Sequence, residues 1–267
     1  VLHGTFGEDG TFQGLLEMGD LAYVGPGVTG SATGMDKAVF ADLMRANRIP
    51  IVDTVLVLRS ELETAMESTL DRVEELGRYP YFVKPCNLGS SVGISKVKNR
   101  SDLLEGLMEG AAYDRRVIVQ KGHNVREIEV SVMGNDQPVA SVCGEVLPGE
   151  EFYSYDAKYH DDSSRTVIPA EIPEEAAEQI RELAVKAYKA CDLAGLARVD
   201  FFIDRDTDEI FINELNTIPG FTEISMYPML WKASGVENSE LVDKLIGYAL
   251  ERKAQRDATK RNFYRNE

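Results

Sequence analysis

The feature that most constrains the fold of this chain is a hairpin near its C-terminal end. Two runs of β-branched and aromatic residues, 197–203 and 209–216, flank a short acidic turn and indicate two antiparallel strands. If Ile203 lies opposite Glu209, strand alternation places seven side chains on one face: Arg198, Asp200, Phe202, Ile210, Ile212, Glu214 and Asn216. In this register Arg198 faces Glu214 and Asp200 is diagonal to Glu214.

The polar end of this face predicts a metal site. Asp200, Glu214 and Asn216 supply two carboxylates and an amide oxygen, an incomplete set of hard donors that leaves Mg²⁺ room for water and substrate phosphates. The alternative is a solvated face, the usual fate of charged residues on a strand. The metal site is favoured because Glu214 and Asn216 interrupt the apolar end of a strand instead of its turn.

Composition limits the possible partners. The chain has 267 residues, 43% hydrophobic and 28% charged, which is enough for two packed domains. Its formal net charge of -16, without a run of Lys and Arg, argues against nucleic acid as a partner. Three cysteines, Cys86, Cys143 and Cys191, have no CxxC spacing and are typical of a reducing compartment. No signal peptide or apolar run of bilayer length occurs, so we expect no membrane partner.

A glycine-rich segment, 25–30, matches the GxGxxG pattern of dinucleotide-binding turns. We interpret it as a structural turn after a strand at 21–24, because Pro26 has no N–H, no helix is expected directly after Gly30, and the required acidic residue would be Asp53 at best. A nicotinamide-dependent dehydrogenase is the alternative.

The remaining pattern alternates helices and strands. Helices are expected at 12–18, from an Asp36 cap to before Pro50, at 60–76 and 101–110, from Pro173, and at 239–252. Strands are expected at 51–58, 81–85, from Ile94, and at 116–120, 127–133 and 138–146. We expect the helix from Pro173 to pack on the sheet that contains the hairpin. The polar, tyrosine-rich stretch 149–164 has no period and predicts a lid or binding loop.

Lys84 ends a strand and precedes a Gly/Ser loop at 87–93. This arrangement either presents an ammonium and backbone N–H groups to phosphate or is a plain hairpin with a solvated lysine.

These pieces together resemble a known family. Lys84, the Gly/Ser loop, the run Arg198 to Phe201 and the run Asn213 to Thr222 resemble D-alanine–D-alanine ligases of the ATP-grasp superfamily, in order and over essentially the whole chain. The resemblance implies an α/β (α+β) ATP-grasp fold in which a nucleotide is sandwiched between two sheet-containing subdomains. The implied division is a remnant of an α/β N-terminal domain at 1–35, a central subdomain at 36–122, and a C-terminal subdomain at 123–267 with the lid loop.

The implied reaction joins two D-alanine molecules through a D-alanyl phosphate, with ATP cleaved to ADP and phosphate, for peptidoglycan synthesis. The family also implies two Mg²⁺ ions, with Mn²⁺ able to replace them, a cytoplasmic location and a homodimer. Tyr159, which follows Lys158 in the lid loop, favours D-alanine over D-lactate as second substrate.

The resemblance also implies roles for individual residues. Lys37 and Lys84 would hold ATP phosphates under the loop at Ser90 and Ser91, and Gln120, Lys121 and Glu127 would bind adenosine. Asp200, Glu214 and Asn216 would bind the metal ions, with Glu214 bridging them. Arg198 and the Gly220 N–H would stabilise the oxyanion, while Ser90 and Tyr159 orient the substrate. His3 would lie near the carboxylate of the first D-alanine, and Ser225 and Met226 near that of the second.

Two features depart from the family pattern. Gln120 stands where most members carry a glutamate, although its amide oxygen can still accept a hydrogen from adenine. The family's first strand and Gly-rich turn do not precede Val1, so we expect an upstream segment to be missing. A nucleotide-binding remnant without ligase activity and another ATP-grasp carboxylate–amine ligase, of the D-Ala-D-Ser or D-Ala-D-Lac type, remain as alternatives.

Overall fold

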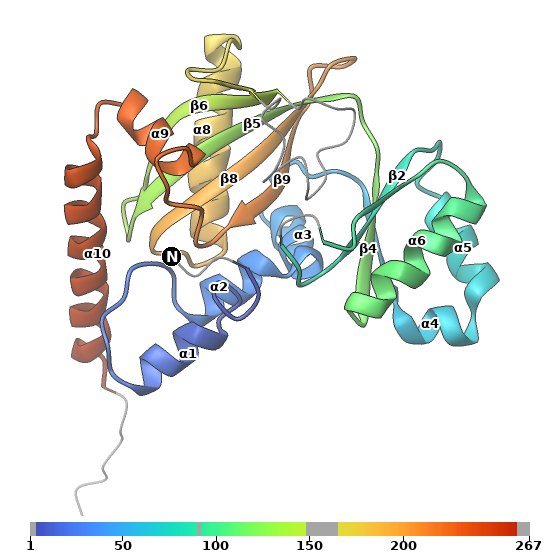
Figure 1. Ribbon diagram of the computed structural model, residues 1–267, viewed down its shortest axis with the longest axis horizontal. Coiled ribbons are helices and arrows are strands. Elements are labelled where there is room, and N and C mark those ends of the chain that lie inside the picture. The colour runs from blue at the N-terminus through green and yellow to red at the C-terminus, as the bar shows by residue number, and fades with distance from the viewer. Residues whose placement is uncertain (1–3, 90–91, 148–164, 261–267) are drawn as a thin grey trace, which may run out of the picture.

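Two antiparallel sheets form the framework of the computed structural model, which describes residues 4–89, 92–147 and 165–260 (Figure 1). The smaller sheet has the order β1-β4-β2-β3, from β1 (Thr54–Leu58), β2 (Tyr81–Pro85), β3 (Ser95–Val97) and β4 (Arg116–Lys121). The larger has the order β7-β6-β5-β8-β9, from β5 (Val125–Gly134), β6 (Val139–Leu147), β7 (Arg165–Val167), β8 (Gly195–Asp204) and β9 (Ile210–Asn216). This mixed architecture confirms the expected fold class. One sheet lies on each side of the boundary expected at residue 122, while the division into three domains stays a proposal.

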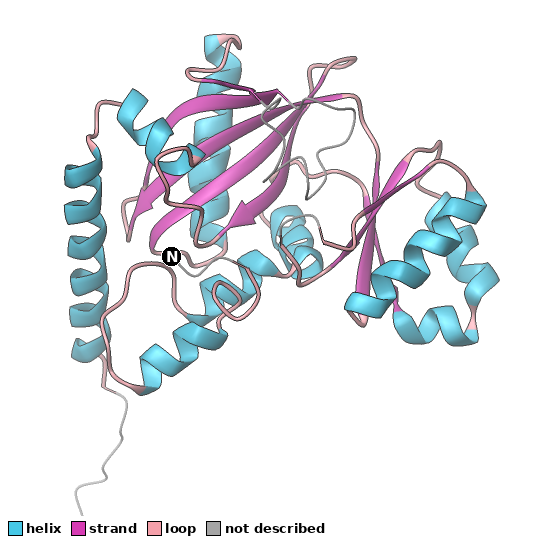
Figure 2. Ribbon diagram, viewed as in Figure 1, coloured by secondary structure: helices cyan, strands magenta, loops and turns pink. Residues whose placement is uncertain are grey.

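Helices pack against both sheets (Figure 2). The smaller sheet packs against α6 (Arg100–Tyr113), with α4 (Arg59–Thr64) and α5 (Met66–Glu74) beside it. The larger sheet is covered by α8 (Glu174–Ala190), α9 (Met226–Ala233) and α10 (Asn238–Ala258). The chain begins with α1 (Thr11–Met18), α2 (Val28–Met35) and α3 (Lys37–Ala46).

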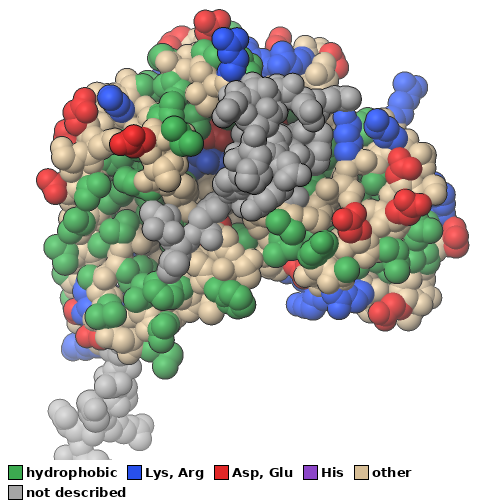
Figure 3. Space-filling view, viewed as in Figure 1, with side chains coloured by type: hydrophobic (Ala, Val, Ile, Leu, Met, Phe, Trp, Pro, Cys, Tyr) green, Lys and Arg blue, Asp and Glu red, His purple; other side chains and the backbone are tan. Residues whose placement is uncertain are grey.

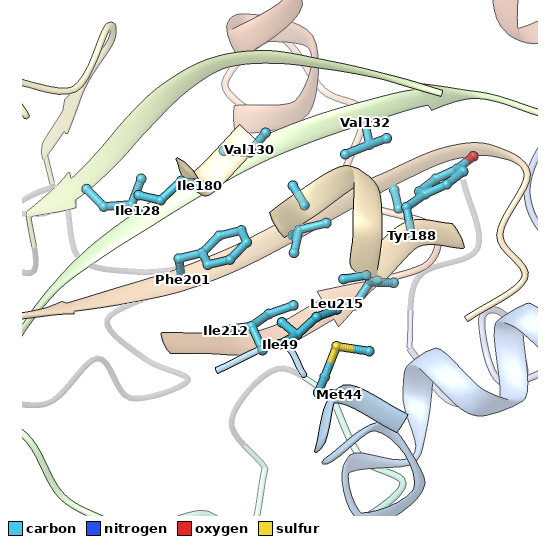
Figure 4. Close-up of a cluster of buried hydrophobic side chains, with 14 of the residues drawn as sticks. Met44, Ile49, Ile128, Val130, Val132, Ile180, Tyr188, Phe201, Ile212 and Leu215 are labelled. Carbon is cyan, nitrogen blue, oxygen red and sulfur yellow. The ribbon is translucent and has the colours of Figure 1, made fainter. Parts of the chain in front are cut away.

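The main core lies between α8 and the larger sheet, as expected (Figure 4). Ile180 and Tyr188 of α8 and Phe201 of β8 are almost completely buried there, and the Tyr188 hydroxyl donates to the Gly134 carbonyl at 2.7 Å. Burying one such side chain contributes about 1.5–3 kcal/mol to folding. The tight packing of this face fixes β8, and with it the side chains that point the other way.

The opposite face of the larger sheet is divided between packing and a cleft. Alternate residues of β8 point away from α8, and Leu196 packs with Met133 and α9 in a second core. Further along β8, Arg198 and Asp200 are outside that cluster. The helices α9 and α10 therefore cover one end of this face and leave the other end to the cleft.

The register of the hairpin differs from the expected one. Asp200 lies opposite Glu214 and Arg198 opposite Asn216, whereas Ile203 pairs with Ile210 instead of Glu209. Between these two sets of pairs the register shifts, and Asn213 is the extra residue of a β-bulge. Arg198, Asp200, Glu214 and Asn216 therefore share a face, as predicted.

The bulge makes the prediction wrong for Ile210 and Ile212. Both side chains belong to the core under α8, on the face opposite Glu214. A bulge reverses side-chain alternation at one position, so an apolar half-strand and a polar half-strand can each face their proper environment.

Other local expectations were wrong at specific points. Residues 21–24 form no strand, and α2 begins at Val28 inside the glycine-rich segment. The helix expected at 60–76 is broken at Ala65 into α4 and α5.

The expected cap of α3 is confirmed, because the Asp36 carboxylate accepts from the N–H groups of Ala38 and Val39. The lid predicted at 149–164 lies outside the described residues.

An ionic cluster joins α10 to the last turn of α1 and the segment after it. Arg252 Nη2 lies 2.6 Å from Glu17 Oε1 and 2.6 Å from the Tyr23 hydroxyl, and Arg256 contacts both Glu17 and Asp20. Burial alone would raise the pKa of Glu17, but Tyr23 and the two arginines hold the pKa below its usual value. Elsewhere on the face seen in Figure 3, acidic and basic side chains are interspersed. No helix of the described ranges is long and apolar enough to cross a membrane.

Candidate active site

A cavity of about 530 Å³ opens between the two sheets. The smaller sheet contributes basic, aromatic and amide side chains: Phe82, Lys84, Lys96, Gln120 and Lys121. Beside several apolar residues, the larger sheet contributes a set of four carboxylates and a phenylalanine: Glu127, Glu129, Asp200, Phe202 and Glu214. The cavity therefore has a basic wall, which is the set from the smaller sheet, and an acidic wall, which is the set from the larger sheet.

Arg198 organises the acidic wall. Its Nε and Nη2 donate to the two oxygens of Asp200 at 2.7 and 2.8 Å, and its Nε lies 3.0 Å from Glu129 Oε2. Burial would lower the pKa of Arg198, but the charges of Asp200 and Glu129 raise it well above its usual value. The guanidinium is therefore a fixed cation. Asn216 also donates its amide to Asp200 Oδ2 at 2.9 Å, so the side chain of Asp200 is held from two sides.

The donor set of the predicted metal site fits a magnesium ion whose coordination shell is completed by substrate and water. Asp200 and Glu214 are direct cross-strand partners at the cavity, and the Nδ2 donation by Asn216 leaves its amide oxygen as the atom suited to a cation. No group of three or more His, Cys, Asp or Glu side chains with metal-ligand spacing occurs in the described part of the chain. Two carboxylates and an amide suit Mg²⁺, which takes few protein ligands and completes its shell with water and phosphate oxygens.

The basic wall is built by strand pairing. Phe82 of β2 lies opposite Lys96 of β3 on one side and opposite Gln120 of β4 on the other. Lys96 Nζ lies 5.9 Å from the centre of the Phe82 ring, and Gln120 Nε2 donates to Thr54 Oγ1 at 3.3 Å. Because Nε2 of Gln120 donates to Thr54, its Oε1 is the atom suited to accept a hydrogen bond in the cavity.

A hydrogen bond crosses from the basic wall to the bulge of the larger sheet. Lys84 Nζ donates to Asn213 Oδ1 at 3.4 Å. Because Asn213 precedes Glu214, this contact places a lysine ammonium beside the acidic wall. A phosphate bound there would meet a cation from one sheet and carboxylate oxygens from the other.

Other predicted residues lie away from the cavity lining. Lys37 Nζ donates to the Leu88 carbonyl at 2.6 Å, in the Gly/Ser loop. Gly220 and Ser225 adjoin each other in the loop after β9, where a Cβ on Gly220 would lie 3.0 Å from Ser225 Oγ. Met226 begins α9 and buries its side chain with Leu230, so only its backbone N–H suits a ligand. His3, Ser90, Ser91 and Tyr159 are outside the described residues.

Several residues at or near the site were missed from the sequence. Lys96, His123 and Arg205 line the cavity but belong to no local motif, because distant strands and turns bring them together. Buried Glu8 accepts from the N–H groups of Gly4, at 2.8 Å, and Ile218, at 3.3 Å. It therefore fixes the loop after β9 against the N-terminal loop, and only its position within the glycine-rich stretch 4–10 could have indicated a special role.

Comparison with known proteins gives consistent matches. Residues 43–247 match the family model described as the D-ala D-ala ligase C-terminus. The D-alanine–D-alanine ligase of Acetivibrio thermocellus is 52% identical over 252 residues, which cover 94% of this chain and 67% of the relative. That of Heliobacterium modesticaldum is 52% identical over 263 residues, covering 98% and 72%.

Two solved structures have similar folds. The D-alanine–D-alanine ligase from Coxiella burnetii superposes with a TM-score of 0.82 at 39% identity, over 96% of this chain and 68% of its own. The VanG D-Ala:D-Ser ligase from Enterococcus faecalis superposes with a TM-score of 0.83 at 38% identity, over 92% and 71%.

Proposed function

The chain belongs to the D-alanine–D-alanine ligase family, and on this basis we propose that it joins two D-alanine molecules in an ATP-dependent reaction. The observation that carries the proposal is the cavity in which Lys84 and Gln120 of one sheet face Asp200 and Glu214 of the other. A nucleotide with its phosphates toward the acidic wall matches both sets of side chains. The product would serve peptidoglycan synthesis.

The reaction would proceed in two steps. The carboxylate of the first D-alanine attacks the γ-phosphorus of ATP, which forms D-alanyl phosphate and releases ADP. The amine of the second D-alanine then attacks the acyl carbon, which forms the peptide bond and releases phosphate and a proton. Such chemistry depends on positioning and on neutralising charge more than on covalent help from the protein.

The basic wall would hold the nucleotide. Lys84 would pair with phosphate oxygens, and Lys37 would join it through the neighbouring loop. Gln120, Lys121 and Glu127 would bind adenosine, with the Gln120 oxygen accepting from the adenine amino group.

The acidic wall would hold the metal ions and the reacting groups. Asp200, Glu214 and Asn216 would bind Mg²⁺, or Mn²⁺ in its place, which supplies neutralisation of phosphate charge when bound. Arg198 would stabilise the oxyanion as a cation whose orientation Asp200 and Glu129 already fix. The N–H of Gly220 would be a second donor, and the start of α9 at Ser225 and Met226 would receive the carboxylate of the second substrate.

Incubation with ATP, Mg²⁺ and D-alanine tests the proposal, with mass spectrometry for the dipeptide and an assay for phosphate. We expect one phosphate for each dipeptide. ATP binding without dipeptide would instead indicate a nucleotide-binding remnant. Parallel reactions with D-serine or D-lactate as second substrate test the choice of D-alanine, because phosphate release with one of these and not with D-alanine would contradict it. We further propose that the chain is cytoplasmic and that it forms a homodimer. Sedimentation at several protein concentrations tests the dimer.

A further inference from the structure

His123 is a cavity-lining side chain to which the proposed reaction gives no role. It lies in the short connection between β4 and β5, and its Nδ1 lies 2.7 Å from Asp204 Oδ2 in the turn between β8 and β9. The two side chains are 19% and 7% exposed. This hydrogen bond joins two segments that are distant in sequence at one end of the cavity.

Both segments are held in place. The Gly122 N–H donates to the Pro80 carbonyl at 2.8 Å, and a Cβ on Gly122 would come within 2.6 Å of that oxygen. On the other side, the Arg205 N–H donates to the Asn124 carbonyl at 2.8 Å. The imidazole itself packs against Phe211, with ring centroids 5.3 Å apart. His123 is thus positioned before any ligand binds.

Asp204 determines which nitrogen of the ring carries a proton. Burial alone would raise the pKa of Asp204, but the N–H groups of Asp206 and Thr207 and the ring of His123 hold it below its usual value. An ionised carboxylate only accepts hydrogen bonds, so Nδ1 must carry the proton. In the neutral imidazole, Nε2 is then the acceptor.

The position of the pair separates it from the phosphate end of the cavity. Asp204 lies four positions beyond Asp200 on β8, about 13 Å away at the usual rise of a strand. With phosphates at Asp200 and Glu214, the nucleoside of the same molecule extends toward Gln120 and His123. A fixed acceptor at this end needs a donor, and the nucleoside offers two kinds: the exocyclic amino group of adenine and the ribose hydroxyls.

We propose that His123 is a nucleoside-binding residue, that its Nε2 accepts a hydrogen bond from the bound adenosine, and that Asp204 is the positioning residue that aims it. This inference rests on the proposed nucleotide site, but it does not require that the chain ligates D-alanine.

Calorimetry with Mg²⁺ and nucleotide tests the inference at pH 8. The ligands are ATP, purine riboside triphosphate, which lacks the amino group, and 2′-deoxy-ATP and 3′-deoxy-ATP, which each lack a ribose hydroxyl. For His123→Leu we expect the Kd of ATP to rise about fivefold, which corresponds to one lost hydrogen bond. For one of the three analogues, the same substitution should change the Kd less than twofold, because that analogue already lacks the group that donates to His123.

Further variants separate binding from structure. His123→Gln keeps an acceptor, so its Kd for ATP should stay within about twofold of the wild-type value. The Kd of Asp204→Asn should lie between the values for His123→Gln and His123→Leu. Asp206→Asn removes a carboxylate from the same exposed turn and should leave every Kd unchanged. In the ligase assay, His123→Leu should raise the KM of ATP and leave kcat unchanged, because the interaction is the same before and during reaction.

Equal weakening of ATP and all three analogues, or a lower melting temperature with no change in any Kd, would overturn the inference and leave the pair a purely structural contact. Wild-type protein that binds ATP but makes no dipeptide would defeat the proposed ligase while the ratios of Kd values still decide the role of His123. Wild-type protein that binds no ATP would defeat both.

Discussion

The two walls of the cavity differ in how firmly they are built. On the acidic wall, the carboxylate of Asp200 is bound by Arg198 and Asn216, and Arg198 also contacts Glu129. On the basic wall, Lys84 and Lys96 extend their ammonium groups on long stems from the strands of the smaller sheet. A rigid anionic surface therefore faces an adaptable cationic one.

This difference corresponds to what each wall would have to do. Metal ions and the reacting carbonyl need donors held within fractions of an ångström, since misplacement is costly in rate. Phosphates need charge more than a fixed geometry, which a lysine supplies as a compact cation on a flexible stem. A chain with a formal charge of -16 can in this way bind an anion, because a few lysines converge where the metal ions would complete the neutralisation.

The largest expected effect comes from the rigid wall. Glu214→Gln keeps the shape of the side chain but removes a charge from the proposed metal site, so we expect kcat for phosphate release to fall at least about a hundredfold. Removal of divalent ions from the wild type by a chelator should produce the same loss. Asp206→Asn, in the exposed turn of the same hairpin, serves as the control. Full activity of Glu214→Gln would remove Glu214 from the metal site.

A smaller loss is expected on the adaptable wall. Lys84→Ala removes one charge-assisted contact to phosphate, worth about 1.5–3 kcal/mol, so the KM of ATP should rise roughly 10–100-fold. Steady-state kinetics at saturating D-alanine measures this change. Lys98→Ala, an exposed lysine just after β3, should leave the KM unchanged. Equal effects of the two substitutions would mean that Lys84 acts only through the overall charge.

Lys96 tests how adaptable the basic wall is. Its ammonium lies above the Phe82 ring, so Lys96→Met keeps much of the packing and removes the charge. We expect the KM of ATP to rise only about threefold, because Lys84 remains to meet the phosphates. Measurements at low and high salt should show that this small effect fades as ionic strength increases. An effect as large as that of Lys84→Ala would contradict the expected order.

The smallest effect is expected at Gln120. In Gln120→Glu, a carboxylate oxygen replaces the amide oxygen as acceptor. The Thr54 hydroxyl now donates to the Val52 carbonyl at 2.8 Å, and it can turn from that carbonyl to donate to the other carboxylate oxygen. The Kd of ATP, measured by calorimetry, should therefore change by less than about threefold. A tenfold change in either direction would show that the amide itself is required.

The sequence alone predicted the parts of this site that depend on local pattern. Alternation placed Arg198, Asp200, Glu214 and Asn216 on one face, and β2 occurs at the expected residues with Lys84 on it. These features follow from the two-residue period of a strand, which neighbouring residues determine.

The sequence failed where long-range contacts decide the structure. Lys96 and His123 reach the cavity through strand pairing and through a turn 81 residues away in the chain. The α2 segment, which has two glycines, has weak helix propensity, and its Gly30 and Gly34 are packed so closely on Asp192 and Thr217 that a Cβ would clash. Tertiary packing therefore stabilises a helix that local preference does not predict.

The extra residue at Asn213 lets two consecutive residues of one strand line the same cavity. Asn213 and Glu214 both line it, while Ile212 before them and Leu215 after them belong to the core. Deleting Asn213 would leave a regular ladder in which Glu214 still lies opposite Asp200, but it would remove the acceptor to which Lys84 donates. The bulge therefore adds a contact between the two walls without turning Glu214 away from the cavity.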